Sequence, residues 1–378
     1  MRVLGKNLEN ADVFNRLRGA LHSVMPVNLQ LGKRTGDFEP IERDGLRAQC
    51  LRDWPEDPSF IQQWDALSRG GPSPHPFAGP IWQRAMLRHL AAAGSLRVIA
   101  VWRGQHLKAV FPLVYRANAT LETPHRWVSD YLDPPVDATE AAACWNLMLE
   151  LLARLWDWSV NAVVFPHIRP ELNCRTLLPE LAAAHGFKFG ETPAENIARI
   201  QLPETFDAYM ALHSSPERKN TLRKMRKAVG QANAKLVEIT DAPRGMEVLK
   251  VVLDQVEAGK KQSKANFVRR VIRPLMTGAS PDLFSSGWLK AMQLQIFDAR
   301  PAANLLVFDS AVGPQIYNAS YDESCKEWSP GSVLFAMTLQ QAIERKAKVF
   351  DLMRGDEEYK KRMHASIEPL YTVTLHRA

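Results

Sequence analysis

Cysteine is scarce in this 378-residue chain, and long apolar runs are missing from it. The four cysteines, Cys50, Cys144, Cys174 and Cys325, are far apart and fit neither the spacing of metal ligands nor a disulfide framework. No apolar run approaches the length of about 18 residues that a membrane-spanning helix needs. The N-terminus also lacks a basic region followed by an apolar core and a cleavage site. These absences predict a cytoplasmic protein with reduced thiols and no bound metal.

Basic residues only slightly outnumber acidic ones, which gives a formal net charge of +7. This bias favours anionic partners such as coenzyme phosphates, lipid-linked sugar phosphates or the inner face of the cytoplasmic membrane. It does not by itself indicate nucleic acid, so no nucleic-acid partner is expected. A chain of this length with 46% hydrophobic residues predicts two domains, and nothing in it indicates an oligomeric state.

The order of the predicted elements repeats in the two halves of the chain. In the first half a hairpin around residues 103–106 is followed by a strand, a proline-containing loop, a helix and a buried strand. The same order runs from residue 289 to residue 353 in the second half. The prediction is an α/β fold of tandem domains, each a mixed, mostly antiparallel sheet flanked by helices. Its boundaries are an N-terminal extension at 1–45 and domains at 46–199 and 200–378.

A loop reading Ser329-Pro330-Gly331-Ser332 precedes the predicted helix of the second half. Backbone N–H groups from Gly331 through Leu334 are expected to be unpaired at such a helix start, where the helix dipole adds partial positive charge. Ser329, Gly331, Ser332 and Val333 are therefore candidates for binding a phosphate or a thioester oxygen of a co-substrate. The alternative is an ordinary helix start, with Ser329 as the N-cap and Pro330 as the first helical residue.

Two side chains near this loop have the chemistry for acyl transfer, which requires a base for the attacking amine and a proton for the departing thiolate. Asp351 lies inside an apolar strand on the same face as Val349 and Met353, so a partly desolvated carboxylate with a raised pKa is expected there. A structural aspartate that accepts backbone hydrogen bonds explains it equally well. Tyr321 is a candidate proton donor to the thiolate, and the alternative is a tyrosine of the core.

A basic segment at residues 218–227 is predicted to be a helix. Its apolar residues Leu222, Met225 and Val229 are spaced to face the core, which leaves the basic side chains, including Arg223, outside. Such a face can hold an anionic substrate or contact acidic lipid headgroups. The alternative is a solvated surface.

This basic segment, the Ser329-Pro330-Gly331 loop and the terminal motif Arg-Gly-Asp-Glu-Glu-Tyr-Lys at 354–360 occur in this order. Together they resemble the CelD-like (BioF-type) branch of the GNAT acetyltransferase superfamily, which is related to the FemAB peptidoglycan aminoacyltransferases. The resemblance is best over residues 200–365 and weaker over 50–195. It implies tandem GNAT-like domains, acetyl-coenzyme A or another acyl-coenzyme A as co-substrate, and a small-molecule or lipid-linked glycan acceptor.

The resemblance also implies roles for residues of the terminal motif. Lys360 is expected to face a phosphate or the oxyanion, with Asp356 as its partner or as an anchor for the acceptor. Arg354, Glu357 and Tyr359, together with Arg223, are expected to bind the substrate. Without the resemblance, charged residues in such a turn are usually only solvated.

The N-terminal domain is expected to be degenerate, because Asp133-Pro134-Pro135 replaces the Pro-Gly loop and no similar motif follows Arg169. The preferred function is an acyl-coenzyme A dependent N-acyltransferase that acts on an amino group of a sugar or of an exopolysaccharide or cell-envelope precursor. One alternative is aminoacyl transfer of the FemAB type. The other is a non-catalytic GNAT-like module in exopolysaccharide biosynthesis, which stays open because the usual glycine-rich phosphate loop is reduced to Gly331.

Overall fold

The computed structural model describes residues 39–71, 74–90, 95–116, 119–124, 127–155, 160–172, 174–258 and 262–377. Most of the predicted extension, residues 1–38, therefore lies outside the described residues. The described chain divides into two compact units. The C-terminal unit is Ile197–Ile367, and the N-terminal unit consists of the described residues up to Asn196 and from Glu368 onward.

The sheet of the N-terminal unit has the strand order β1-β2-β3-β4-β5-β6-β13-β7. Its strands are β1 (Ile41–Arg43), β2 (Leu46–Leu51), β3 (Leu96–Arg103), β4 (His106–Arg116), β5 (Thr120–Glu122), β6 (Ala162–Ile168), β7 (Phe187–Gln201) and β13 (Ser366–Arg377). The predicted hairpin is β3–β4, in which Arg103 pairs with His106. Strands β5 and β6 run parallel. The helix that connects them must therefore cross over the sheet.

The helices of this unit are α2 (Pro58–Gly70), η1 (Pro76–Ala78), α3 (Pro80–Leu90), α4 (Ala141–Leu155) and α5 (Cys174–Ala184). Helix α4 is the crossover between β5 and β6, and its apolar side chains enter the main core of the unit. The Trp145 ring lies 4.7 Å from that of Phe111 on β4 and 5.3 Å from that of Phe165 on β6. This aromatic contact fixes the start of α4 over the sheet.

The sheet of the C-terminal unit has the order β7-β12-β11-β10-β9-β8, with β7 contributing its residues from Ile197. The additional strands are β8 (Lys235–Ile239), β9 (Leu289–Ile296), β10 (Arg300–Phe308), β11 (Gln315–Tyr321) and β12 (Val349–Arg354). Strands β9 and β10 form the predicted second hairpin, and β11 and β12 are parallel. Both units thus contain a hairpin, a strand, a loop, a helix and a parallel strand in this order, which confirms the predicted α/β class.

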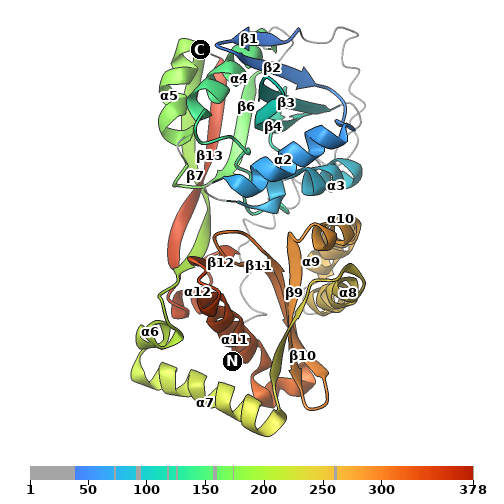
Figure 1. The fold of residues 1–378 in the computed structure, drawn as a ribbon, viewed down its shortest axis with the longest axis vertical. Coiled ribbons are helices and arrows are strands. Elements are labelled where there is room, and N and C mark those ends of the chain that lie inside the picture. The colour runs from blue at the N-terminus through green and yellow to red at the C-terminus, as the bar shows by residue number, and fades with distance from the viewer. Residues whose placement is uncertain are drawn as a thin grey trace. The chain divides into compact units, whose positions relative to one another are not determined.

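Helices cover both faces of this sheet (Figure 1). They are α6 (Phe206–Ala211), α7 (Ser215–Ala232), α8 (Ala242–Ala258), α9 (Gln262–Phe267), η3 (Val268–Ile272), α10 (Arg273–Ser285), η4 (Glu323–Trp328), α11 (Pro330–Glu344) and α12 (Glu358–Arg362). Ala228 and Ala232 of α7 and Leu339 of α11 belong to one core with Met292 of β9 and Leu305 of β10. Helices α8 and α10 pack together and cover the opposite face.

The parallel ladder between β11 and β12 consists of one residue pair, Gln315 opposite Asp351. Just before this pair, Gly313 has a φ of 151° and approaches the Val349 carbonyl so closely that a Cβ atom would overlap its oxygen. A residue without a side chain is therefore needed where the two strands meet. Past this point the strands are no longer paired with each other, although both continue.

The last strand, β13, pairs with β6 through Tyr371–His376 and belongs mainly to the N-terminal unit. The domain boundaries expected from the sequence, 46–199 and 200–378, place this strand with the other domain. The difference arises because strand pairing across a long sequence separation leaves no local signal in the sequence.

Candidate functional site

A pocket of about 300 Å³ lies within the C-terminal unit, between α6 and α7 on one side and α11 and α12 on the other. We call it the C-terminal pocket. It brings the expected loop residues Gly331 and Ser332 together with Tyr359 of the terminal motif. Segments separated by more than a hundred residues in sequence therefore meet at one site.

Helix α7 presents a polar face to the C-terminal pocket. Glu217, Asn220, Thr221 and Lys224 line it, and their spacing of three, one and three residues places them on one side of a helix. Burial, and then the nearby Arg223, lowers the pKa of Lys224. Among the described residues, Lys224 has no carboxylate partner. A half-buried cation without an anion beside it is typical of an anion-binding site.

The start of α7 is fixed by a capping box. The Glu217 carboxylate accepts hydrogen bonds from the Ser214 hydroxyl at 2.5 Å and from the Ser214 backbone N–H at 3.2 Å. Glu217 stays ionised, but Lys224 lies seven residues, about two helical turns, further on and forms no ion pair with it. The pocket keeps its excess of positive charge.

The face of α7 that is buried differs from the predicted one. Val229 was expected to face the core and is 50% exposed, whereas the buried residues are Ala228 and Ala232. Leu222 is partly buried against the core, as expected. The prediction for Val229 was wrong because alanines, not the larger apolar residues, form the buried face of α7. Their small side chains let α11 approach α7 closely.

Helix α11 begins at the pocket. Ser329 precedes it with a left-handed backbone, φ 53° and ψ 48°, and its side chain does not cap the helix. Pro330 has no N–H, and the Val333 N–H donates to the Ser329 carbonyl at 3.1 Å. The remaining N–H groups of the first turn, on Gly331 and Ser332, are those that a helix leaves unpaired. Both residues line the pocket, so their N–H groups lie beside it, at the positive end of the helix dipole.

The rest of the pocket wall is largely apolar and aromatic. Phe335 and Leu339 of α11 line it, and the Tyr359 ring lies 6.5 Å from that of Phe335. The Tyr209 hydroxyl donates to the Met363 carbonyl at 3.1 Å, which ties α6 to the end of α12. Burial raises the pKa of both Tyr209 and Tyr359, so both hydroxyls stay neutral. Such a wall suits the uncharged arm of an amphipathic ligand.

Three residues that line the site were not among the candidates of the sequence analysis: Lys224, His213 and Arg362. His213 lines the pocket, and its ring lies 4.4 Å from that of His364. Burial, and then the His364 ring, lowers the pKa of His213, so its imidazole is neutral near pH 7. Arg362, one residue before Met363, adds a second cation without a carboxylate partner among the described residues. No local pattern pairs His213 with His364, because the contact forms only when α6 meets α12.

Lys360 is buried rather than facing the pocket. Its ammonium donates to the carbonyl oxygens of Met353 at 3.4 Å, Arg354 at 2.7 Å and Gly355 at 3.4 Å, and forms an ion pair of 3.1 Å with Glu357. The side chain of Lys360 is 3% exposed. It therefore holds together the turn that follows β12. The expected contact with a phosphate would require this shell of oxygen atoms to open.

Asp351 is buried in β12, away from the C-terminal pocket. Its carboxylate accepts a hydrogen bond of 2.7 Å from the N–H of Met353, whose backbone is left-handed with a φ of 58°. The side chain thus supports an irregular strand end, which is the structural alternative that the sequence allowed. A role as base stays a prediction.

The other candidates lie apart from the pocket lining. The Tyr321 hydroxyl donates to the Glu323 carboxylate at 2.9 Å, and this hydrogen bond raises the pKa of Tyr321. Arg223 is exposed and donates to Asn220 at 2.9 Å, and Asp356 is exposed. Arg354 is half-buried at the end of β12, where its carbonyl accepts from Lys360. Their predicted roles stay predictions.

Within the described residues, no group of three or more histidine, cysteine, aspartate or glutamate side chains is placed to hold a metal ion. In the same part of the chain, no helix combines the length and the apolarity needed to cross a membrane. The four cysteine thiols are buried and unpaired. Burial raises the pKa of Cys144 and Cys174 to about 12, so these thiols are not nucleophiles at neutral pH.

Comparison with known proteins agrees with this geometry. Residues 216–361 match the family model of the acetyltransferase (GNAT) domain, which spans α7 to α12 and includes ten of the fifteen residues that line the pocket, but not His213 or Arg362. No curated protein sequence matches the chain significantly.

Solved structures share the fold of both units at low identity. FemX is 11% identical, with a TM-score of 0.58 over 83% of this chain and 95% of that chain. The C-terminal domain of a putative lysylphosphatidylglycerol synthetase from Agrobacterium fabrum is 13% identical, with a TM-score of 0.54 over 83% and 90%. L-PGS from Bacillus licheniformis is 13% identical, with a TM-score of 0.53 over 85% and 92%.

The match and the fold together confirm the predicted relationship to GNAT and FemAB-like proteins. A GNAT domain implies an acyl-coenzyme A co-substrate and an acceptor. Residues 216–361 are thus similar to the acetyltransferase (GNAT) domain, which supports an N-acyltransferase, and the fold of the described chain is similar to that of FemX.

Proposed function

We propose that the protein transfers an acyl group, preferably acetyl, from acyl-coenzyme A directly to an amino group of a sugar or of an exopolysaccharide or cell-envelope precursor. The observation that carries the proposal is the meeting of Lys224, Arg362 and the start of α11 at one pocket. Two cations and the unpaired N–H groups of a helix start supply what a diphosphate requires. The apolar wall around Phe335 and Leu339 suits the uncharged arm of the coenzyme.

Direct transfer forms a bond between the amine nitrogen and the acyl carbon and breaks the bond from that carbon to sulfur. The attacking amine must lose a proton, and the departing thiolate must gain one. His213 is the base that the pocket favours, because its neutral imidazole lines it. Asp351 stays the second proposed base, and Tyr321 stays the proposed proton donor to the thiolate.

The residues that we propose to contact the phosphates differ in part from those that the sequence predicted. Gly331 and Ser332 are proposed to bind the donor through the backbone at the start of α11. The backbone N–H groups of Ser329 and Val333, also predicted to bind it, already donate to the carbonyls of Lys326 and Ser329. Lys224 takes the place proposed for Lys360, whose ammonium already contacts three carbonyl oxygens. Asp356, together with the substrate residues Arg223, Arg354, Glu357 and Tyr359, is proposed to act on the acceptor side.

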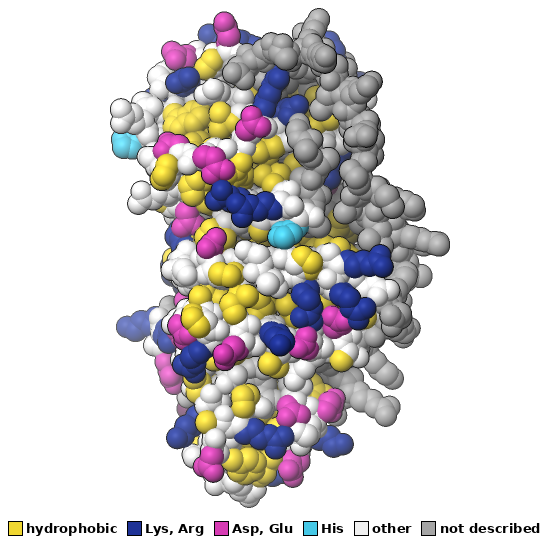
Figure 2. Space-filling model, turned by 90° about the vertical axis from the view of Figure 1, so that its right-hand side faces the viewer, with side chains coloured by type: hydrophobic (Ala, Val, Ile, Leu, Met, Phe, Trp, Pro, Cys, Tyr) yellow, Lys and Arg dark blue, Asp and Glu magenta, His cyan; other side chains and the backbone are white. Residues whose placement is uncertain are grey.

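Aminoacyl transfer of the FemAB type is the second candidate, because the solved structures with this fold include FemX and lysylphosphatidylglycerol synthetase domains. Such a donor would need a broad basic surface for charged transfer RNA. On the face drawn in Figure 2, basic and acidic side chains of the described residues are interspersed. The synthetase likeness supports a lipid-linked acceptor, which a protein would meet at the inner face of the membrane.

Calorimetric titration with acetyl-coenzyme A tests the donor. The wild type is compared with Gly331→Trp, which fills the pocket, and with Gly230→Trp, which places the same side chain on an open surface of α7. Binding by the wild type and the Gly230 variant, and its loss in the Gly331 variant, supports the proposal. No binding by a folded wild type would remove the coenzyme A donor. Salt-sensitive retention on charged transfer RNA would then favour the second candidate.

The acceptor is tested once donor binding is established. Release of free thiol from acetyl-coenzyme A is measured with amino sugars, with their N-acetylated forms as controls that offer no amine. Turnover with the free amines alone supports an amino-sugar acceptor. If amino acids or lipid amines are acetylated but amino sugars are not, the acceptor is not a sugar. Acetyl-coenzyme A would still be the donor.

A further inference from the structure

Helix α7 carries an excess of basic residues on a side that does not face the C-terminal pocket. Its 18 residues include six cations and one carboxylate, that of Glu217. Lys224 lines the pocket, whereas Lys219, Arg223 and Arg226 do not, and all three are exposed. Their spacing of four and three residues places them on one side of the helix. We call Lys219, Arg223 and Arg226 the basic stripe.

The basic stripe has no acidic partner. Among the residues that the structure describes, no carboxylate forms an ion pair with its three cations, and Arg223 donates to the neutral Asn220 at 2.9 Å. Like charges four residues apart, such as Lys219 and Arg223, destabilise a helix. The stripe therefore costs the protein stability unless an anionic surface lies against it.

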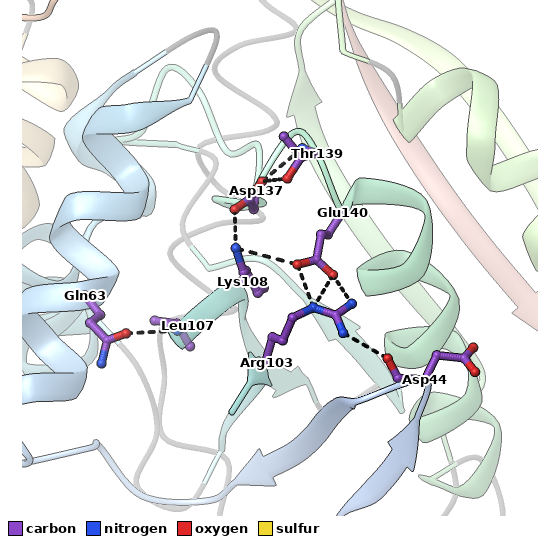
Figure 3. Close-up of polar contacts among 8 residues, drawn as sticks. All are labelled: Asp44, Gln63, Arg103, Leu107, Lys108, Asp137, Thr139 and Glu140. Carbon is purple, nitrogen blue, oxygen red and sulfur yellow. Dashed lines mark hydrogen bonds and ion pairs between the residues drawn. The ribbon is translucent and has the colours of Figure 1, made fainter. Parts of the chain in front are cut away.

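Basic side chains of the N-terminal unit show the usual arrangement, in which carboxylates neutralise them (Figure 3). Arg103 of β3 binds Glu140 at 2.9 Å, and Lys108 of β4 binds Asp137 at 2.8 Å. Such pairs leave little charge for a partner. The basic stripe, by contrast, keeps its whole charge available.

Exposed apolar side chains gather around the same helix. Among the described residues, four large apolar side chains are 43–53% exposed: Leu212, Val229, Val251 and Phe297. Leu212 comes just before α7, and Val229 is in its last turn, three residues after Arg226 and so next to it on the helix surface. The Phe297 N–H donates to the Ala232 carbonyl at the end of α7. Three of the four exposed apolar side chains thus lie on α7 or at its ends.

An aromatic pair extends this surface past the end of α7. The Phe297 ring packs edge to face against Trp328 of η4, with 5.5 Å between the ring centres. The Lys227 ammonium lies 4.6 Å from the centre of the same indole ring and donates to the Glu327 carbonyl at 3.2 Å. Tryptophan and lysine side chains of this kind are common where a protein meets lipid headgroups. Asp298 and Glu327 are exposed at this end, so the positive potential is strongest along the basic stripe.

We propose that this surface of α7 docks on a lipid bilayer that contains anionic phospholipid. Headgroup phosphates would supply the anions that the basic stripe lacks, and each cation near such a surface strengthens the attraction. Leu212, Val229 and Phe297 would enter the boundary between the headgroups and the acyl chains. RNA also offers phosphates, but it has no apolar phase in which leucine and valine could be buried. The exposed apolar side chains therefore favour the bilayer.

Docking would place the C-terminal pocket close to the headgroups, because another side of α7 lines it. A helix with its side chains is about 10–12 Å across, which sets the scale of that distance. A lipid-linked acceptor could then reach the pocket without leaving the bilayer. This consequence rests on the proposed function, but the docking does not, since it can be measured without turnover.

Co-flotation of the full chain with vesicles tests the docking. The wild type should bind vesicles of phosphatidylcholine mixed with phosphatidylglycerol at least tenfold more tightly than vesicles of phosphatidylcholine alone. Replacing Lys219 and Arg226 together with glutamine should weaken binding to the mixed vesicles at least tenfold. Lys188 and Arg88 are the control, because the same double replacement removes one lysine and one arginine from exposed positions of the other unit. This control should bind like the wild type.

A matched pair of valine variants tests whether apolar side chains enter the bilayer. Val229→Ser should weaken binding to the mixed vesicles roughly fivefold, because the exposed half of the valine would no longer be buried in lipid. Val251→Ser makes the same change on α8 and should bind like the wild type. Circular dichroism verifies that each variant is folded.

Three outcomes would overturn the proposal. The first is a folded wild type that does not bind the mixed vesicles, and the second is equal binding to both kinds of vesicle. The third is a Val229→Ser variant that binds like the wild type, since the contact would then be electrostatic alone. Retention on transfer RNA that the Lys219 and Arg226 variant loses would in that case assign the basic stripe to RNA. None of these outcomes affects the titration with acetyl-coenzyme A, so the proposed function is tested separately.

Discussion

The ammonium of Lys360 lies 2.7 Å from the carbonyl oxygen of Arg354 and 3.1 Å from the carboxylate of Glu357. These contacts hold the turn that leads from β12 into α12. Because α12 carries Tyr359 and Arg362 to the C-terminal pocket, the turn positions the pocket indirectly.

Replacing Lys360 with methionine should lower the free energy of unfolding by about 2 kcal/mol. The carbonyl oxygens and Glu357 would lose their donor, and the partial exposure of Glu357 limits the loss. Urea unfolding monitored by circular dichroism measures it. Lys361→Met is the control, since Lys361 is half exposed and pairs only with Glu358. Unchanged stability with a lost affinity for acetyl-coenzyme A would instead assign Lys360 to the phosphate.

Replacing Lys224 with methionine should weaken binding of acetyl-coenzyme A roughly tenfold. A half-buried ammonium that contacts a phosphate contributes about 1.5 kcal/mol, and screening by salt should reduce the difference between variant and wild type. Titration calorimetry at two salt concentrations checks both expectations. Lys219→Met removes the same charge from an exposed position of α7 and should bind normally. Equal weakening in both variants would point to general electrostatic attraction instead of a contact.

The acidic limb of the pH–rate profile should lie below pH 6.5. His213 acts as a base only when neutral, and burial together with His364 lowers its pKa below the ordinary value of 6.5. The rate therefore holds as the pH falls to 6.5 and declines below it, as the ring becomes protonated. His364→Gln removes one cause of the lowered pKa and should move the limb to higher pH. A limb that stays in place in His213→Gln would exclude this imidazole as the base.

Replacing Gly313 with alanine should destabilise the C-terminal unit by at least about 2 kcal/mol. The backbone there has a φ of 151°, and the added Cβ would overlap the Val349 carbonyl oxygen, so β11 and β12 could not meet. Thermal unfolding measures the effect. Gly70→Ala is the matched control, because a Cβ at Gly70 meets no atom within 4 Å. If both variants unfold at the temperature of the wild type, β11 and β12 must be able to separate at this point without loss of stability.

Local patterns in the sequence predicted much of the fold. The turn at residues 103–106 predicted the β3–β4 hairpin, and the repeated order of elements predicted two similar sheets. The Pro-Gly loop also predicted residues that line the C-terminal pocket, Gly331 and Ser332, and their binding of the donor stays a prediction. Each of these signals depends on neighbours in sequence, which is why they could be read without the structure.

The remaining site residues depend on contacts that only the folded chain makes. His213 and His364 are far apart in sequence, and their rings meet because α6 packs against α12. Lys360 was expected to face a phosphate or the oxyanion, and its burial could not be predicted because the carbonyl oxygens around it belong to the backbone and leave no pattern in the side chains. Phe297 and Trp328 come from separate segments, and only the folded chain brings their rings together at the end of α7.

The pairing of β13 with β6 determines the order in which the units can be completed during synthesis. The N-terminal unit is made first, but its sheet needs residues Tyr371–His376, which leave the ribosome after the whole C-terminal unit. At translation rates of about 5–20 residues per second, the edge of β6 waits roughly 10–40 s for its partner. An exposed strand edge can pair with other chains during that time. Until β13 is made, the nascent N-terminal unit therefore has an unpaired strand edge inside its sheet.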